Sequence, residues 1–295
     1  MNSIAILTDS NSGITQTQAK ELGIFVIPMP FMIDGKNYLE DIDLTQADFY
    51  RMLEDNSDIH TSQPAPGDIM GTWDKILKDY DQIVYIPMSS GLSSTCSNAS
   101  IYARDYEDRV FVVNNQRISV TQRQSAIDAY VMAQNGIPAP EIKKILEETK
   151  FDSSIYITLD TLKYLKKGGR ITPAATAFAE ILNLKPILQI QGEKLDSFSK
   201  CRGIKQAKNI MINAIKNDID HRFGGIDTSH PNCFLCIAHT NNYEAAEVFK
   251  SEIEAAFPGY PVHVDPLSLS IACHIGPGSI AMACARVIPQ GQQIQ

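Results

Sequence analysis

The sequence contains no apolar run long enough to cross a bilayer, which takes about 20 consecutive apolar residues in a helix. Its first residues, MNSIAILTDS, lack the basic segment and the cleavage site of a secretory signal peptide. It also lacks an excess of positive charge, because 26 Lys and Arg stand against 34 Asp and Glu. A nucleic-acid partner would require a basic face. These absences predict a cytoplasmic protein that binds no nucleic acid and makes at most transient contact with a membrane surface.

Cysteine is sparse, with six residues in 295, and one C-x-x-C spacing occurs, from Cys233 to Cys236. That pair lies in an apolar run typical of a buried strand, whereas a redox-active pair sits at a helix start and a zinc site needs further ligands. The six thiols are therefore expected to be small buried side chains in a reducing compartment. No metal ion and no cofactor is predicted.

Two families of catalytic loop are missing. No Gly-Lys-Ser/Thr ends a glycine-rich loop, and no kinase-type glycine loop with its lysine occurs, so the chain has no recognisable ATP site. The nucleophile elbow Gly-x-Ser-x-Gly is also absent, because the stretch Gly91-Leu92-Ser93-Ser94-Thr95 lacks the second glycine.

The stretch from Met88 to Thr95 is rich in hydroxyl side chains and stands between two predicted elements. The apolar run Ile83–Ile86 before it is typical of a buried parallel strand, and residues 97–104 after it favour a helix. The first N–H groups of a helix are unpaired and favour negative charge, so this turn is a candidate anion site. Ser and Thr also serve as plain helix caps, and the loop alone leaves both interpretations open.

The length of 295 residues favours two domains. Strands and helices alternate over residues 1–154, which predicts an N-terminal three-layer α/β domain with a parallel sheet, interrupted by a small β excursion near 29–45. Residues 155–295 mix hairpins with helices and predict a C-terminal α+β domain. Within it, residues 173–182 favour a helix that is apolar on all sides, as in a buried helix or the wall of an apolar cavity.

Five short motifs occur in a fixed order along the chain. They are Thr8-Asp9-Ser10, Thr61-Ser62-Gln63-Pro64, Ser89-Ser90-Gly91-Leu92-Ser93-Ser94-Thr95, Lys167-Gly168-Gly169-Arg170-Ile171 and His274-Ile275-Gly276-Pro277-Gly278. Together they resemble the DegV family of fatty-acid-binding proteins, which includes FakB, the binding subunit of bacterial fatty acid kinase. The likeness spans almost the full chain.

The resemblance implies that an acyl chain lies in a cleft between the two domains and that a separate ATP-dependent kinase subunit phosphorylates its carboxylate for phospholipid synthesis. The chain itself would then be a non-catalytic, lipid-binding subunit. The family's carboxylate-binding hydroxyls correspond to Thr61 and Ser93, with Ser62 and Ser94 beside them, and its histidine corresponds to His274.

The remaining matched positions are assigned to support or docking. Arg170, beside Lys166 and Lys167, corresponds to the arginine of the Gly-Gly-Arg turn and is a predicted docking residue for the kinase. Asp9 and Ser10 match the family's early Asp-Ser, and Gly276 and Gly278 fix the turn after His274.

The sequence departs from the family pattern at two places. Ala65 stands where a serine is usual, and Ser94-Thr95-Cys96 replaces Gly-Thr-Tyr, which leaves the preferred acyl chain open. Two other functions also remain open: a serine hydrolase or acyltransferase using Ser93, His274 and Asp9, and a carrier of another small anionic metabolite.

Overall fold

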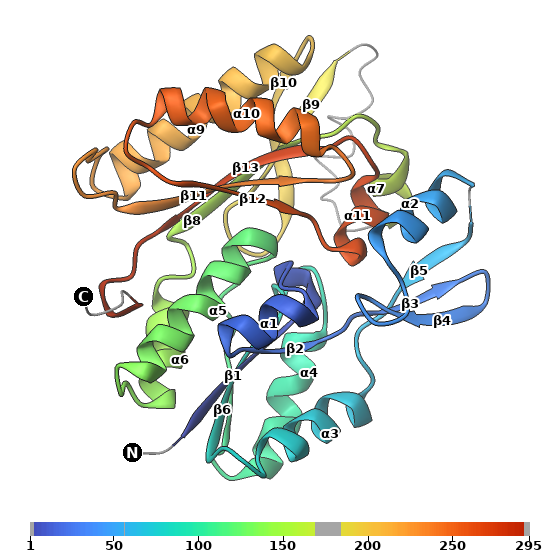
Figure 1. The fold of residues 1–295 in the computed structure, drawn as a ribbon, viewed down its shortest axis with the longest axis vertical. Helices are drawn as coiled ribbons and strands as arrows, with labels where there is room; N and C mark the ends of the chain where they lie inside the picture. The colour runs from blue at the N-terminus through green and yellow to red at the C-terminus, as the bar shows by residue number, and fades with distance from the viewer. Residues whose placement is uncertain (1–2, 56, 169–183, 292–295) are drawn as a thin grey trace. The chain divides into compact units, whose positions relative to one another are not determined.

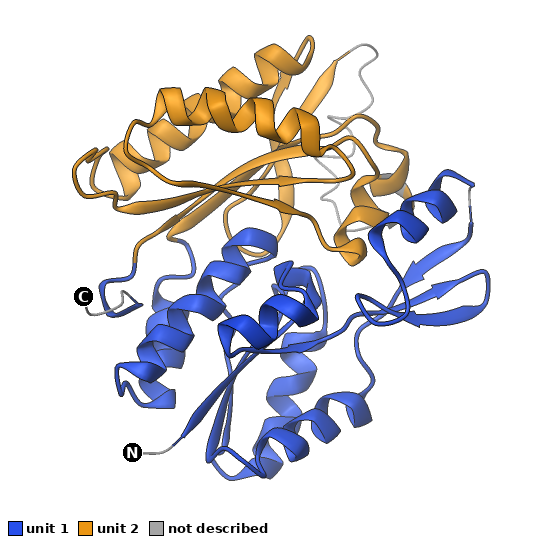
Figure 2. Cartoon of the chain, in the orientation of Figure 1, with its two compact units in different colours: residues 1–151, 288–295 blue, residues 152–287 orange. Residues whose placement is uncertain are grey.

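The computed structural model describes residues 3–55, 57–168 and 184–291, and it divides into two compact units. Unit 1 comprises residues 1–151 and 288–295, and unit 2 comprises residues 152–287 (Figure 2). These ranges differ from the predicted domains 1–154 and 155–295 because the chain returns to unit 1 at its end. Ile288 is buried in the core of unit 1, and the short helix η3 (Pro289–Gly291) packs on the long helix of that unit.

Unit 1 is built on a parallel sheet with the strand order β2-β1-β6-β7 (Figure 1). Its strands are β1 (Ile4–Asp9), β2 (Phe25–Ile27), β6 (Gln82–Ile86) and β7 (Val110–Val112). Consecutive side chains of a strand point to opposite faces, and here both faces are covered. Ile6 and Val84 face one core, and Leu7 and Tyr85 face another. The predicted three-layer α/β fold is confirmed.

The helices of unit 1 form the two outer layers of this sandwich. One layer supplies Ala19, Ala129 and Ile142 to the first core, and the other supplies Trp73 and Ala99 to the second. The first layer contains α1 (Gln16–Leu22), α5 (Ser119–Gln134) and α6 (Ala139–Glu148), and the second contains α3 (Pro66–Ile76) and α4 (Thr95–Tyr102), which continues as η2 (Ala103–Tyr106).

The predicted β excursion is a three-stranded antiparallel sheet with the order β4-β3-β5. Along the chain, the helix α2 (Gln46–Glu54) lies between β4 and β5. A turn at Asp34-Gly35, both with positive φ, joins β3 (Pro30–Ile33) to β4 (Lys36–Leu39). The third strand, β5 (Ile59–Thr61), was not predicted because the prolines at 64 and 66 indicated a loop. The strand is three residues long and ends before the first of them.

Unit 2 contains a six-stranded mixed sheet with the order β10-β9-β8-β13-β11-β12. All neighbours are antiparallel except β11 and β12, so the predicted α+β character is confirmed. The strands are β8 (Ser153–Thr158), β9 (Lys185–Ile190), β10 (Leu195–Cys201), β11 (Cys233–His239), β12 (Val262–Pro266) and β13 (Ile280–Arg286).

Two long helices, α9 (Ile204–Arg222) and α10 (Tyr243–Ala256), bury Met211, Ile215 and Phe249 in one core with this sheet.

Two elements of unit 2 were not predicted from the sequence. The strand β13 is buried at six of its seven positions, so it shows no alternation of apolar and polar residues. The helix α11 (Leu269–Ile275) has seven residues, too few to show a helical period. The short helix α7 (Lys163–Gly168) packs against α11.

None of the helices in the described ranges is both long and apolar enough to cross a membrane. The apolar helix predicted at 173–182 lies outside the described residues, as does Arg170.

Candidate functional site

The first predicted loop follows β1 and turns into η1 (Ser10–Ser12). Asp9 is fully buried, and its carboxylate accepts hydrogen bonds from Met88 N at 2.9 Å and Asn11 N at 3.1 Å. Its third partner is Gln122 of α5, whose Nε2 lies 3.1 Å from Oδ1. Burial raises the pKa of the Asp9 carboxyl, and the hydrogen bonds from Met88, Asn11 and Gln122 oppose that effect. Asp9 therefore joins the first loop to the end of β6.

Ser10 lies beside a second buried carboxylate. Its hydroxyl donates to Glu40 Oε2 at 2.6 Å and accepts from Met29 N at 3.0 Å. Glu40 is only 5% exposed, and nothing in the sequence indicated it, because it follows an ordinary strand of the β excursion. Ser10 thus ties the first loop to the small sheet.

The central hydroxyl-rich loop, residues 88–94, is held by backbone hydrogen bonds within the loop and to Arg117. Ser89 N donates to Arg117 O at 2.9 Å, and Ser93 N donates to Ser89 O at 3.1 Å. The Ser93 hydroxyl lies 2.8 Å from Thr95 Oγ1 and accepts from Thr95 N at 3.2 Å. Ser94 occupies the N-cap position of α4 but makes no side-chain cap, and it is exposed. The loop presents Ser93 and Ser94 at the start of a helix, as the sequence predicted.

Thr61 and Ser62 lie at the end of β5, where Thr61 is half-buried and paired with Phe31. Ser62 is exposed, and its N–H donates to Pro30 O at 3.3 Å. The next residue, Gln63, accepts a hydrogen bond through Oε1 from Asn98 Nδ2 at 3.0 Å. Because Asn98 belongs to α4, this bond brings the Thr61 loop to the helix that begins beside Ser93.

In unit 2, His274 lies in the last turn of α11 and is half-buried. The turn that follows it is fixed by Thr240, whose Oγ1 donates to Gly276 O at 2.6 Å and whose carbonyl accepts from Gly278 N at 2.7 Å. Gly276 has a φ of +78°, and a Cβ there would overlap the ring of Tyr164 in α7. Gly276 thus permits close packing of the turn against α7, and Gly278 permits its approach to Asp160.

Six of the predicted site residues belong to unit 1: Thr61, Ser62, Ser93, Ser94, Asp9 and Ser10. Their loops are connected by the hydrogen bond from Met88 to Asp9 and by the hydrogen bond between Asn98 and Gln63. His274, Gly276 and Gly278 belong to unit 2. The sequence did not indicate Gln122 or Asn98, because amides in helices carry no characteristic pattern. Gln63 stands in the second motif, but no role was assigned to it. The side chains of Lys163 and Lys167 are exposed on α7.

The cysteines are free thiols, and five of the six are buried. Cys233 faces the core beneath α9 and α10, and burial raises its pKa to about 12. Cys236 is three residues further along the same strand, so its side chain points to the other face of the sheet. Within residues 3–55, 57–168 and 184–291, no group of three His, Cys, Asp or Glu side chains could hold a metal ion.

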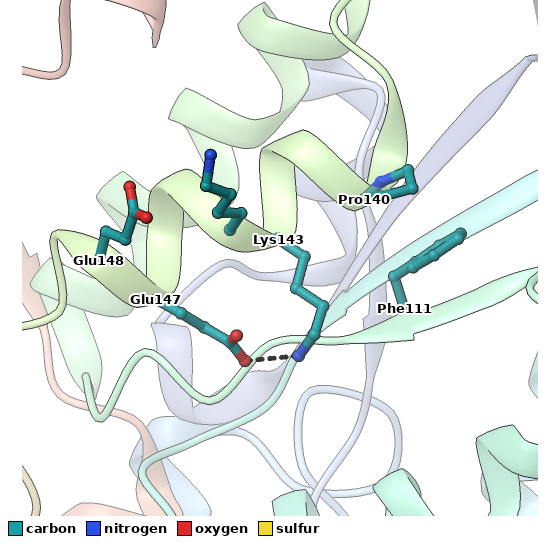
Figure 3. A pocket seen from close by; sticks show the side chains of 6 residues that line it. Phe111, Pro140, Lys143, Glu147 and Glu148 are labelled. Atoms are coloured by element: carbon teal, nitrogen blue, oxygen red, sulfur yellow. Dashed lines mark hydrogen bonds and ion pairs between the residues drawn. The ribbon is translucent and has the colours of Figure 1, made fainter.

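A cavity of about 520 Å³ lies elsewhere in unit 1, between α6 and the edge strand β7 (Figure 3). Lys143, one of its lining residues, donates through Nζ to Glu147 Oε1 at 2.5 Å and also to Val112 O. None of the predicted site residues lines it. The residues that do are Phe111, Pro140, Lys143, Lys144, Glu147 and Glu148.

Known proteins resemble this chain over nearly its whole length. It is 34% identical over 258 residues to a DegV domain-containing protein of Caldanaerobacter subterraneus, covering 87% of this chain and 88% of that protein. Two solved structures match 97% of this chain and all of theirs. One is a DegV family protein from Thermus thermophilus described by its fatty acid binding, with 25% identity and a TM-score of 0.87. The other is DegV, a fatty acid binding protein from Bacillus subtilis, with 26% identity and a TM-score of 0.86.

The predicted family is confirmed by a profile that describes its members as uncharacterised proteins of the DegV family. That profile matches residues 3–287. The chain therefore belongs to the DegV family.

Proposed function

We propose that this protein binds a long-chain fatty acid and holds its carboxylate with the hydroxyls of Thr61 and Ser93. The observation that carries the proposal is the match of 97% of the chain to the fatty-acid-binding proteins of Thermus thermophilus and Bacillus subtilis. Ser62, Ser94 and His274 are assigned to the same carboxylate. That the ligand lies in a cleft between two domains stays a prediction.

The hydrogen bonds around Ser93 leave its hydroxyl suited to donate to a carboxylate. Its oxygen accepts from Thr95 N and lies 2.8 Å from Thr95 Oγ1. If the Thr95 hydroxyl donates in that contact, the hydrogen of Ser93 is left to donate to a ligand oxygen. The N-terminus of α4, which begins at Thr95, adds a favourable dipole for the same negative charge.

Hydroxyl and N–H groups hold the carboxylate without a buried ion pair. Burying the acyl tail supplies the larger part of the binding free energy, at about 0.8 kcal/mol per CH₂. The head group then sets the orientation of the ligand and remains chemically available.

The proposed partner is a separate ATP-dependent kinase subunit, as in bacterial fatty acid kinase. A carboxylate oxygen of the bound fatty acid would attack the γ-phosphate of ATP in the kinase and give an acyl-phosphate and ADP. The chain itself would be a non-catalytic cytoplasmic subunit in phospholipid synthesis. Arg170 is the proposed docking residue, so Arg170→Ala should keep lipid binding and lower acyl-phosphate formation; equal loss of both would contradict the docking role.

The hydrolase alternative needs Asp9 to orient the imidazole of His274. The carboxylate of Asp9 instead accepts hydrogen bonds from Met88, Asn11 and Gln122, which tie it to the backbone and to α5. Ser93 is likewise hydrogen-bonded to Thr95. This arrangement favours a supporting role for Asp9 and a binding role for Ser93.

The test is mass spectrometry of the purified protein, first native and then denatured. We expect about one equivalent of fatty acid to be released, and to be lost in Thr61→Ala and Ser93→Ala. Ser97→Ala, at an exposed position in the first turn of α4, is the matched control and should retain the ligand. A wild-type protein that carries no fatty acid and takes up no added palmitate would contradict the proposal.

A further inference from the structure

Gln122 is a fully buried amide at the centre of unit 1 (its exposed fraction is 0%), and neither the motifs nor the proposed ligand contacts account for it. It lies in the first turn of α5 and points at the carboxyl ends of two strands. Its Nε2 is 3.0 Å from Thr8 Oγ1, 3.1 Å from Asp9 Oδ1 and 3.2 Å from Ile86 O. One side chain therefore joins β1 and β6 where their polar loops begin.

The network continues from Gln122 into the loop that carries Ser93. Asp9, held by Gln122 through Oδ1, accepts through Oδ2 from Met88 N, the second residue after β6. Ser89 N, one residue on, donates to Arg117 O, and Ser89 O accepts from Ser93 N. The backbone of Ser93 is thus two hydrogen-bonded steps from the Asp9–Gln122 pair.

The far side of this loop is held by backbone in an unusual conformation. Arg117, whose carbonyl accepts from Ser89 N, lies between Gln116 and Ser119, whose φ angles are +55° and +56°. Non-glycine residues are strained at positive φ, and such strain persists only where the surrounding structure enforces it. This segment leads directly into α5. The carbonyl that holds Ser89 and the helix that carries Gln122 therefore belong to one continuous piece of chain.

We propose that Gln122 is a positioning residue that, through Asp9 and Met88, aims the Ser93 hydroxyl at the carboxylate of the bound fatty acid. The inference rests on the proposed function. Gln122 does not touch the ligand; it sets the place of the loop that does. Its effect is therefore confined to the head group and leaves the binding of the acyl tail unchanged.

The test compares two ligands that share a tail and differ in the head, palmitate and 1-hexadecanol. In Gln122→Met, which keeps the length of the side chain and removes its donors, we expect palmitate affinity to fall about tenfold, the equivalent of one or two hydrogen bonds. Affinity for 1-hexadecanol should change less than about twofold. The ratio of the two dissociation constants is the readout, because general destabilisation would lower both affinities together and leave the ratio unchanged.

Gln124→Met is the matched control. Gln124 is on the same helix, but its Nε2 donates to Asp128 Oδ1 and not to the loops of β1 and β6. The ratio should equal that of the wild type. A second variant, Thr8→Val, removes one acceptor of Gln122 with little change of shape. It should raise the dissociation constant of palmitate relative to that of 1-hexadecanol about twofold to threefold.

An unchanged ratio in Gln122→Met overturns the positioning role while the proposed function stands. If that variant does not fold, an unchanged ratio in Thr8→Val overturns it instead. A wild-type protein that binds neither ligand overturns both proposals.

Discussion

Asn98 and Gln63, 35 residues apart in the sequence, connect the first turn of α4 to the loop after β5. The Nδ2 of Asn98 donates to Oε1 of Gln63 at 3.0 Å, and both residues are half-buried. Gln63 follows the hydroxyls of Thr61 and Ser62, and Asn98 lies in the first turn of the helix that begins beside Ser93. This contact fixes the spacing of Thr61 and Ser93, the two hydroxyls proposed to donate to the carboxylate.

Replacement of Asn98 should therefore weaken ligand binding more than it weakens the fold. In Asn98→Ala the hydrogen bond is lost, which should lower the free energy of unfolding by about 1 kcal/mol. Palmitate affinity should fall about twofold to fivefold, as measured by titration calorimetry. Ser100→Ala is the control on the same helix, because Ser100 Oγ donates to Cys96 O of that helix and not to the loop of Thr61. Equal affinities of the two variants would show that the loop spacing does not matter.

Gly276 should be intolerant of any side chain. Alanine there would be strained at φ +78° and would also overlap the ring of Tyr164, whereas alanine at Gly203 would be strained at φ +102° but meets nothing within 4 Å. We expect Gly276→Ala to lower the free energy of unfolding by more than about 2 kcal/mol, and by about 1 kcal/mol or more beyond Gly203→Ala. Denaturant unfolding measures both. A similar loss in the two variants would mean that α7 shifts freely away from the turn.

Asp128 should make the stability of the protein depend on pH. Burial raises the pKa of its carboxyl from 3.8 to about 7, against the hydrogen bond from Gln124 and the charge of Arg117. The folded state then binds the proton more tightly than the unfolded chain does. The stabilisation that this group contributes is accordingly complete at pH values below about 4 and is lost as the pH rises to about 7.

Asp128→Asn removes this titration. The difference between pKa values of 3.8 and about 7 corresponds to a total loss of about 4 kcal/mol in the free energy of unfolding. Part of that loss has already occurred at pH 5. Between pH 5 and pH 8 the wild type should lose about 1 to 3 kcal/mol more stability than the variant does, as measured by urea unfolding at both pH values. Asp79→Asn, at an exposed position, should follow the wild type. A wild-type profile as flat as that of Asp128→Asn would contradict the prediction.

The sequence predicted the layers of the fold because strong local patterns produce them. Apolar runs such as Ile83–Ile86 became β6, and Thr15 with Gln18 and Gly23 delimits α1 through a capping box and a left-handed C-terminal residue. By contrast, β13 and α11 were missed, because a strand buried on both faces and a helix of seven residues have no distinctive period.

The candidate site was predictable only where a motif marks it. Thr61, Ser93 and His274 stand in recognisable motifs, and the structure places the first two on loops that meet through Gln63 and Asn98. Gln122 and Glu40 were not predictable. Each acts through a hydrogen bond to a residue 30 or more positions away, and a single sequence carries no signal for such pairs.

The C-x-x-C pair should behave as two unrelated buried thiols. Cys233 and Cys236 point to opposite faces of β11, and burial raises the pKa of Cys233 to about 12. Since the thiolate is the reactive form, Cys233 should react slowly with iodoacetamide at pH 8. Cys96, whose pKa burial raises to about 11, should also react slowly.

Cys273 is the half-buried cysteine of the six and should be labelled first in the folded protein. Peptide mass spectrometry after a short exposure should find Cys273 modified while Cys233 and Cys236 are unmodified, and denatured protein should take up six labels. Rapid labelling of Cys233 and Cys236 together, or a disulfide between them after mild oxidation, would contradict the prediction. The disulfide would require the two side chains to reach the same face, which the pleat of an intact β11 does not allow. Rapid labelling of both thiols would require β11 to open, because both are buried.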